Sequence, residues 1–124
     1  MARPYILCVD DERDAIDLLR FLLARAGCET TAAASGREAL AALRERRPDL
    51  VLLDLMLPDL DGFGVCEILR RTPATADIPV VMLTAWTSDE ARAQSRTLGA
   101  LDHLAKPFSP RELLARLPRW LEKS

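Results

Sequence analysis

Five polar side chains that could do chemistry stand at the ends of short apolar runs: Asp10, Asp11, Asp54, Thr84 and Lys106. Taken singly, each has a simple structural explanation as a helix cap, a turn residue or a solvated charge. Taken together, three carboxylates in one cleft would repel one another unless a cation lay among them. Oxygen ligands with no His or Cys nearby favour Mg²⁺. A Lys and a Thr hydroxyl beside a metal-bound carboxylate would then suit a phosphoryl group.

These residues need a scaffold that brings positions almost a hundred residues apart into one cleft. Short apolar or β-branched runs with little alternation suit strands covered on both faces, as in a parallel sheet. Such runs are found at 6–9, 50–53, 80–83 and 101–105, with a weaker, edge-type run at 29–33. Helical segments separate them, so right-handed crossovers predict a three-layer α/β sandwich around a five-stranded parallel sheet. Ligands of such sheets bind beyond the carboxyl ends of the strands, where the five side chains meet.

Capping signals mark most of the expected helix ends. Ser or Asp precedes three helical segments and Gly follows two, in patterns that satisfy the free backbone groups of helix termini. The signals are Ser35 with Glu38, Asp61, Ser109 with Pro110 and Glu112, Gly27 and Gly99.

Apolar spacing predicts which side chains each helix buries. In the segment 14–26 the predicted inner face is Ala15, Leu19, Leu22 and Ala26. The segment 88–98 offers the core little beyond Ala91 and Leu98, so we expect it to be weakly anchored. Pro118 removes a backbone donor near the end of the last helix and should kink or stop it.

Composition narrows the function classes. The 124 residues predict a single domain over 1–124 with no second domain for output. Its 17 basic and 19 acidic side chains give a net charge of −2, so no direct nucleic-acid partner is expected. No apolar run is longer than five residues, far short of a membrane span, and no membrane partner is expected. Cys8, Cys28 and Cys66 have no metal-like spacing and are predicted to be reduced and buried, which favours the cytoplasm.

Four stretches, in order and with matching spacing, resemble the response-regulator receiver domains of two-component signalling. They are Ile6–Glu12 (ILCVDDE), Asp54–Gly62 (DLMLPDLDG), Leu83–Ala85 (LTA) and Lys106–Phe108 (KPF). The resemblance covers essentially the whole chain. It implies a flavodoxin-like (βα)5 fold with strand order 2-1-3-4-5, and a signalling phosphoacceptor rather than an enzyme with a separate substrate.

The resemblance also implies how the acidic residues act. Asp54 would accept a phosphoryl group from the phosphohistidine of a histidine kinase or phosphotransfer protein. Asp11 and Asp54 would bind Mg²⁺ directly, together with the backbone carbonyl of Met56, and Asp10 would act through water.

The remaining matched positions imply phosphoryl binding and a switch. Lys106 would pair with one phosphoryl oxygen, and Thr84 with the backbone amide of Ala85 would hold another. The bond to Thr84 would change the 84–122 face, through which a downstream protein or a second copy would dock over 88–122. The Lys106–Pro107 bond is expected to be cis.

Two features depart from the family pattern. His103 stands where the family usually has Tyr or Phe, and is either the switch side chain or a partly exposed strand residue with no role. Alternation in a strand turns it to the face opposite Lys106, toward 88–98. Trp86 and Met56 flank the expected path of a hydrolytic water and cannot orient it, so slow self-dephosphorylation is predicted.

Other functions fit less well. A haloacid-dehalogenase-type phosphatase carries a second Asp two residues after its nucleophile, where this chain has Met56. No Gly-rich phosphate loop follows a strand, as a nucleotide-binding module requires. A degenerate receiver would lack site residues that are all present. Asp102, Arg111 and Arg116 could form ion pairs across a dimer, or could belong to a solvated charged face.

Overall fold

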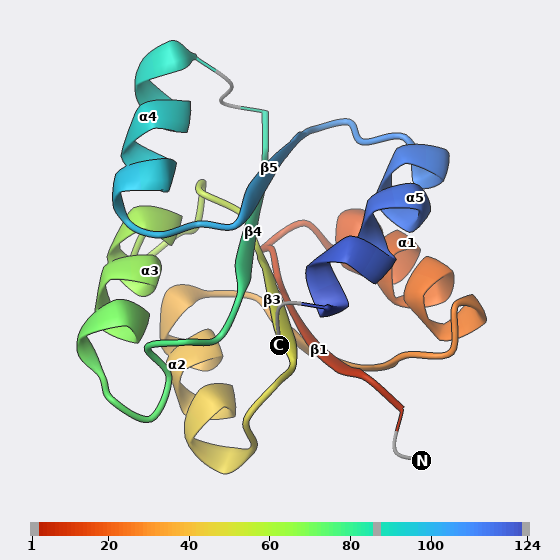
Figure 1. The fold of residues 1–124 in the computed structure, drawn as a ribbon, viewed down its shortest axis with the longest axis horizontal. Helices are drawn as coiled ribbons and strands as arrows, with labels where there is room; N and C mark the ends of the chain where they lie inside the picture. The colour runs from red at the N-terminus through yellow and green to blue at the C-terminus, as the bar shows by residue number, and fades with distance from the viewer. Residues whose placement is uncertain (1–2, 86–87, 123–124) are drawn as a thin grey trace.

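The protein folds as a five-stranded parallel sheet between two layers of helices (Figure 1). The computed structural model describes residues 3–85 and 88–122. The strands are β1 (Tyr5–Val9), β2 (Glu29–Ala33), β3 (Leu50–Leu53), β4 (Val80–Thr84) and β5 (Asp102–Ala105). The helices are α1 (Arg13–Arg25), α2 (Gly36–Glu45), α3 (Gly62–Arg71), α4 (Asp89–Thr97) and α5 (Pro110–Leu121). The strand order is β2-β1-β3-β4-β5, which confirms the predicted fold and the edge position of 29–33.

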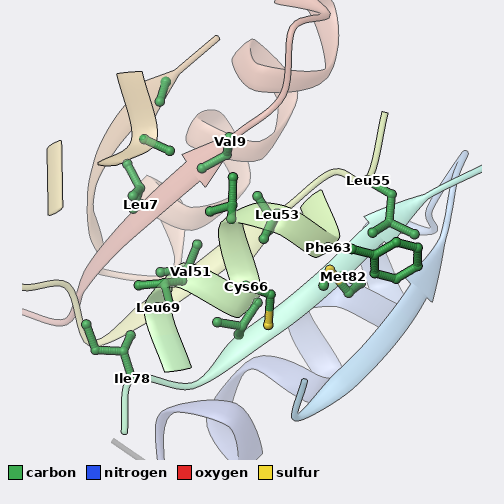
Figure 2. Packing of buried hydrophobic residues seen from close by; sticks show 14 of the residues in the cluster. Leu7, Val9, Val51, Leu53, Leu55, Phe63, Cys66, Leu69, Ile78 and Met82 are labelled. Atoms are coloured by element: carbon green, nitrogen blue, oxygen red, sulfur yellow. The ribbon is translucent and has the colours of Figure 1, made fainter. Parts of the chain in front are cut away.

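The three central strands are buried along their whole length, because helices cover both faces of the sheet. Alternate side chains point to opposite faces, so each strand contributes to two cores. Leu7, Val51 and Met82 pack under α2, α3 and α4, as Figure 2 shows for part of this cluster. Ile6 and Leu52 belong to the second core, under α1 and α5. This two-sided burial fixes the register that aligns the strand ends.

The predicted capping residues are found at the helix ends. Side-chain oxygens of Ser35, Asp61 and Ser109 accept hydrogen bonds from backbone amides three residues later, at 3.1, 2.8 and 3.3 Å. Gly27 and Gly99 have φ angles of 88° and 83°, a left-handed conformation that side chains with a Cβ rarely adopt. The helix limits predicted from these signals are therefore confirmed to within about two residues.

The buried face of α1 differs from the predicted one. The helix buries Ile16, Leu19 and Leu23, while Ala26 is its exposed C-cap residue. The sequence contains two overlapping apolar stripes that share Leu19. The second stripe consists of Ile16, Leu19 and Leu23, whose larger side chains fill the space between the sheet and α5. This stripe is therefore the one that is buried.

The last two helices show one confirmed and one wrong expectation. Helix α4 buries only Ala91 and Ser95, so it is weakly anchored, as predicted. Helix α5 continues through Pro118 to Leu121, so the predicted stop is wrong. Pro118 is exposed and lies in the last turn, where its missing amide removes one hydrogen bond from the solvent-facing side.

The three cysteines are buried and free, as predicted. Within residues 3–85 and 88–122, no helix is long and apolar enough to cross a membrane.

Candidate functional site

The sheet delivers four of the predicted side chains to one edge. Asp10 and Asp54 directly follow β1 and β3, Thr84 is the last residue of β4, and Lys106 directly follows β5. Backbone hydrogen bonds continue past the strand ends: Asp54 N donates to Val9 O at 2.9 Å, and Lys106 N donates to Thr84 O at 3.0 Å. The parallel register therefore places these residues side by side.

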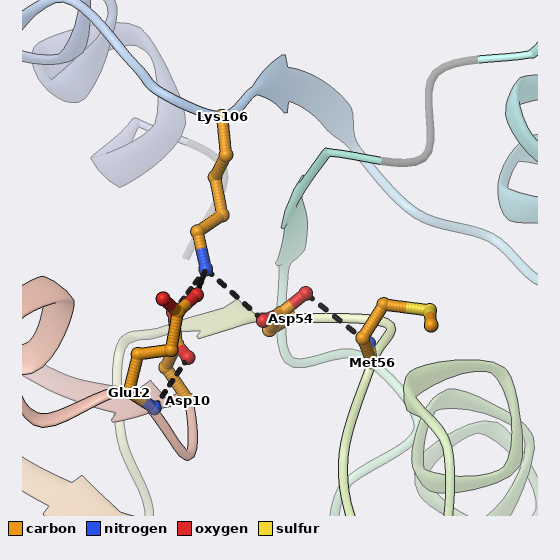
Figure 3. Close-up of polar contacts among 5 residues, drawn as sticks. All are labelled: Asp10, Glu12, Asp54, Met56 and Lys106. Carbon is orange, nitrogen blue, oxygen red and sulfur yellow. Dashed lines mark hydrogen bonds and ion pairs between the residues drawn. The ribbon is translucent and has the colours of Figure 1, made fainter.

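Lys106 lies at the centre of the site (Figure 3). Its Nζ atom lies 2.8 Å from Asp10 Oδ2, 2.8 Å from Glu12 Oε1 and 3.2 Å from Asp54 Oδ2. The Lys106 side chain is only 13% exposed, and Asp10 and Asp54 are buried. One ammonium group thus neutralises part of a cluster of three carboxylates.

Burial and charge act in opposite directions on this cluster. Burial raises the pKa of Asp54, and the amide of Met56 and the charge of Lys106 offset this only in part. Burial acts to lower the pKa of Lys106, but its hydrogen bonds to Asp10 and Glu12 outweigh that effect and raise it. Lys106 in turn lowers the pKa of Glu12. The lysine is therefore firmly protonated, while further positive charge would still stabilise the Asp54 carboxylate.

Three carboxylates could hold a metal ion. Ligand oxygens of Asp10, Glu12 and Asp54 lie within 4.8 Å of one another, a set of hard donors that suits Mg²⁺. Among the described residues Asp11 is not a member of this group, and it is exposed. Sequence reasoning assigned no role to Glu12. The available signal was the acidic run 10–12, in which Asp10 Oδ1 accepts the Glu12 amide at 2.9 Å and bends the chain back.

Met56 and the end of β4 lie around Asp54. The Met56 amide donates to Asp54 Oδ1 at 3.1 Å, and Met56 is 61% exposed. Thr84 is fully buried and Ala85, which follows it, is exposed. The expectation that Trp86 shields the site falls outside the described residues. The bond between Lys106 and Pro107 is cis.

His103 faces α4, away from Lys106. It lines a cavity of about 350 Å³ together with Arg92 and Ser95 of α4 and Arg116 of α5. Its Nε2 atom is buried and has no hydrogen-bond partner among the described residues. Burial and the charge of Arg92 lower the pKa of His103, so the imidazole is neutral near pH 7.

The charged residues near β5 pair within the chain. Arg116 Nη1 lies 3.3 Å from Asp102 Oδ2, and the buried Trp120 donates its Nε1 hydrogen to the same oxygen at 2.9 Å. Arg111 is exposed. Asp102 and Arg116 thus lock α5 onto the edge strand in this structure.

Comparison with known proteins identifies the family. Residues 6–118 match the model of the response regulator receiver domain. The DNA-binding response regulator MtrA of Mycolicibacterium paratuberculosis is 43% identical over 98% of this chain and 53% of its own length. The DNA-binding dual master transcriptional regulator RpaA of Synechocystis is 44% identical over 98% of this chain and 50% of its own. The crystal structure of a putative response regulator from Chloroflexus aurantiacus superposes with a TM-score of 0.92 at 38% identity, covering 98% and 99% of the two chains.

These relatives correct one expectation. The chain spans about half the length of the relatives MtrA and RpaA, and both are named as DNA-binding proteins. The exclusion of nucleic acid as a partner is therefore wrong. It was based on net charge and pI, which describe only these 124 residues and carry no information about the other half of such proteins.

The receiver signature residues, their convergence at the strand ends and the family match lead to one assignment. This chain belongs to the response regulator receiver domain family of two-component signalling.

Proposed function

We propose that this domain is a phosphoacceptor and that Asp54 is the residue phosphorylated. The donor is the phosphohistidine of a histidine kinase or of a phosphotransfer protein. The observation that carries the proposal is the pairing of a buried carboxylate at the end of β3 with the ammonium of Lys106, beside two further carboxylates. The domain catalyses its own phosphorylation and slow dephosphorylation.

The carboxylate cluster supports Mg²⁺ as the cofactor. Asp11, Asp54 and the backbone carbonyl of Met56 would hold it, with Asp10 acting through water. Asp11 is exposed and lies outside the group of close carboxylates, whereas Glu12 belongs to that group. When bound, the ion neutralises the negative charge that builds up as a phosphoryl group approaches Asp54.

The chemical step is an in-line displacement at phosphorus. An oxygen of Asp54 forms the new P–O bond as the P–N bond of the donor breaks. The electron pair of that bond stays on the imidazole nitrogen. The leaving imidazole is neutral when its other nitrogen carries a proton, and otherwise it takes a proton from solvent. Lys106 pairs with one phosphoryl oxygen, and the Thr84 hydroxyl and Ala85 amide donate to another.

The Thr84 contact is proposed to act as the switch. Drawing the hydroxyl of Thr84 toward the phosphoryl group vacates space inside the α4–β5 region, into which His103 can turn. The weak anchoring of α4 supports this, since a helix that buries only two side chains moves at small cost. The 84–122 face then docks a downstream protein or a second copy.

The place of the domain in a larger protein is also part of the proposal. We propose that residues 1–124 form one receiver domain that controls a DNA-binding response, as the names of its relatives MtrA and RpaA suggest. A cytoplasmic location is supported by three free cysteines, which suit a reducing compartment.

Phosphorylation by a small-molecule donor tests the proposal. We expect the wild-type domain to gain one phosphoryl group from acetyl phosphate when Mg²⁺ is present, as a mass increase that hydroxylamine removes. Asp54→Asn should gain none, because an amide cannot form the acyl phosphate. Asp14→Asn, a change of an exposed acid on α1, is the matched control and should behave as wild type. Equal phosphorylation of the wild-type and Asp54→Asn domains would contradict the assignment.

A further inference from the structure

One side chain ties the loop after Asp54 to the N-terminus of α2. Gly36 N donates to Asp59 Oδ1 at 2.9 Å, and Arg37 N donates to Asp59 Oδ2 at 3.1 Å. The guanidinium of Arg37 lies 3.8 Å from the same carboxylate. These contacts join residues more than twenty positions apart, on two different connections of the fold.

The carboxylate of Asp59 completes the capping of α2. The first amides of a helix have no acceptor within the helix. Asp59 accepts the amides of Gly36 and Arg37, while Ser35 Oγ accepts that of Glu38 at 3.1 Å. The backbone amide of Gly36 is the main cause that lowers the pKa of Asp59, so the group is charged at neutral pH. A negative charge at this positive helix end is itself stabilising.

Close packing fixes the same loop against the same helix. A Cβ atom added to Gly36 would lie 2.8 Å from both the Cβ and the carbonyl oxygen of Leu60. Leu60 also packs against the core under α2 and α3. The loop therefore lies directly on the first turn of α2, with Asp59 as the polar contact and Leu60 as the apolar one.

The opposite end of the loop reaches the functional site. The Met56 amide donates to Asp54 Oδ1 at 3.1 Å, and the Gly62 amide donates to Leu55 O at 3.0 Å. Between these two fixed ends the chain runs through Met56 and Pro58, which are exposed. Within this arc Leu57 N donates to Leu55 O at 3.2 Å, and Asp59 supplies the polar contact that ties the arc to α2.

We infer that Asp59 is a positioning residue that aims the backbone carbonyl of Met56 at the cation site beside Asp54. The inference rests on the proposed function, because it assigns a support to one of the proposed Mg²⁺ ligands. Groups that orient a metal ligand typically change metal affinity by 10- to 100-fold. Coupling is reciprocal, so a cation that orders the loop must also protect the first turn of α2.

The test compares two variants that damage the same helix cap. Asp59→Ala removes the hydrogen bonds that join α2 to the loop, and Ser35→Ala removes a cap bond that lies within residues 35–38. We expect similar losses of stability, but only Asp59→Ala should weaken Mg²⁺ binding, by about tenfold in isothermal titration calorimetry. Asp59→Asn keeps a single acceptor oxygen, so its Mg²⁺ affinity should fall between those of the wild-type and Asp59→Ala domains. It also replaces Asp59→Ala in the comparison if the alanine variant does not fold.

Hydrogen exchange gives a readout that does not depend on phosphorylation. In the wild-type domain, Mg²⁺ should slow exchange of the Gly36, Arg37 and Glu38 amides, and in Asp59→Ala this effect should disappear. Wild-type Mg²⁺ affinity in the Asp59 variants, or an equal loss in Ser35→Ala, would overturn the inference and leave the proposed function intact. A wild-type domain that binds no Mg²⁺ would contradict the proposed function and the inference with it.

Discussion

Lys106 is placed where its type of positive charge matters. The chain uses 15 Arg and only two Lys, yet a Lys stands among the carboxylates of the site. An ammonium is compact and sits on a flexible stem, so it can contact three carboxylates at once and later follow a phosphoryl oxygen. A planar guanidinium needs more room and fixed directions for its donors.

Lys106→Arg should therefore be phosphorylated slowly although it keeps the positive charge. We expect the rate of phosphorylation by acetyl phosphate to fall about 100-fold, as when a donor to a developing negative charge is lost. Arg119→Lys, an exposed change on α5, is the control and should be neutral. Near wild-type rates in Lys106→Arg would show that charge alone is needed.

His103 should make the stability of the domain depend on pH. The folded state lowers its pKa through burial and Arg92, with Asp102 acting in the opposite direction. The unfolded chain therefore takes up the proton first, and the stability contributed by the neutral imidazole is lost as pH falls below about 6.5. Urea unfolding at pH 7.5 and 5.5 should show a larger loss for the wild-type domain than for His103→Tyr.

The same pair of proteins tests the role of His103 in the switch. If the charge of the imidazole biases activation, the fraction activated by beryllofluoride should vary between pH 5.5 and 8 in the wild-type domain only. A flat profile in both proteins would leave His103 as a strand residue without a role in switching.

At the scale of elements, two glycines of α3 differ in what surrounds them. A Cβ on Gly62 would lie 2.6 Å from the carbonyl oxygen of Asp54 and 2.8 Å from the Cα of Leu55. A Cβ on Gly64 would lie 2.8 Å from Cδ1 of Leu60, the far end of a flexible side chain. The first clash can be relieved only by moving the backbone that carries Asp54, the proposed acceptor.

Gly62→Ala should therefore damage both stability and function. We expect a loss of roughly 2 kcal/mol in the free energy of unfolding, typical of overpacking, and slower phosphorylation. Gly64→Ala should change the stability by less than about 1 kcal/mol, because better helix propensity offsets the rearrangement of Leu60. Urea denaturation of both variants measures the difference, and equal losses would contradict the explanation.

The elements were more predictable than the contacts between them. Strand limits follow from short apolar runs, and helix starts follow from Ser35, Asp61 and Ser109, because both signals are local in the sequence. The buried face of α1 required knowledge of its partner, since two apolar stripes overlap at Leu19. Pro118 does not stop α5, because a missing hydrogen bond costs less where solvent can satisfy the free carbonyl.

The site residues show the same contrast between local sequence signals and contacts formed only in the fold. Asp10, Asp54 and Lys106 could be found because each directly follows a predicted strand. Glu12 does not, and its place beside Lys106 depends on a turn that the Asp10 side chain stabilises. The role of Asp59 could not be predicted from the sequence either. Its contact joins the loop after β3 to the start of α2, and only the folded sheet brings these two segments together.

At the scale of the whole molecule, the α4–β5–α5 side is the docking face in the proposed function. Asp102 is held by Arg116 and Trp120 within the chain, so these groups are not available to a second copy in this structure. A dimer that uses them must first exchange these contacts. Activation can supply that exchange only if it moves β5 and α5 relative to each other.

We therefore expect the domain to be monomeric alone and dimeric with beryllofluoride and Mg²⁺, as light scattering would measure. Arg116→Ala should stay monomeric in both conditions, since it cannot form the exchanged ion pair. Persistent monomers in the wild-type protein would contradict the dimer and favour docking to a different protein.

The contact between Lys106 and Asp10 joins residues 96 positions apart in a chain of 124. Closing so long a loop is slow and entropically costly, and it depends on β3 and β4 already lying between β1 and β5. A chain that still lacks β5 has Asp54 but not the ammonium group that pairs with it. On the proposed function, phosphoryl transfer to Asp54 therefore requires all five strands to be in place.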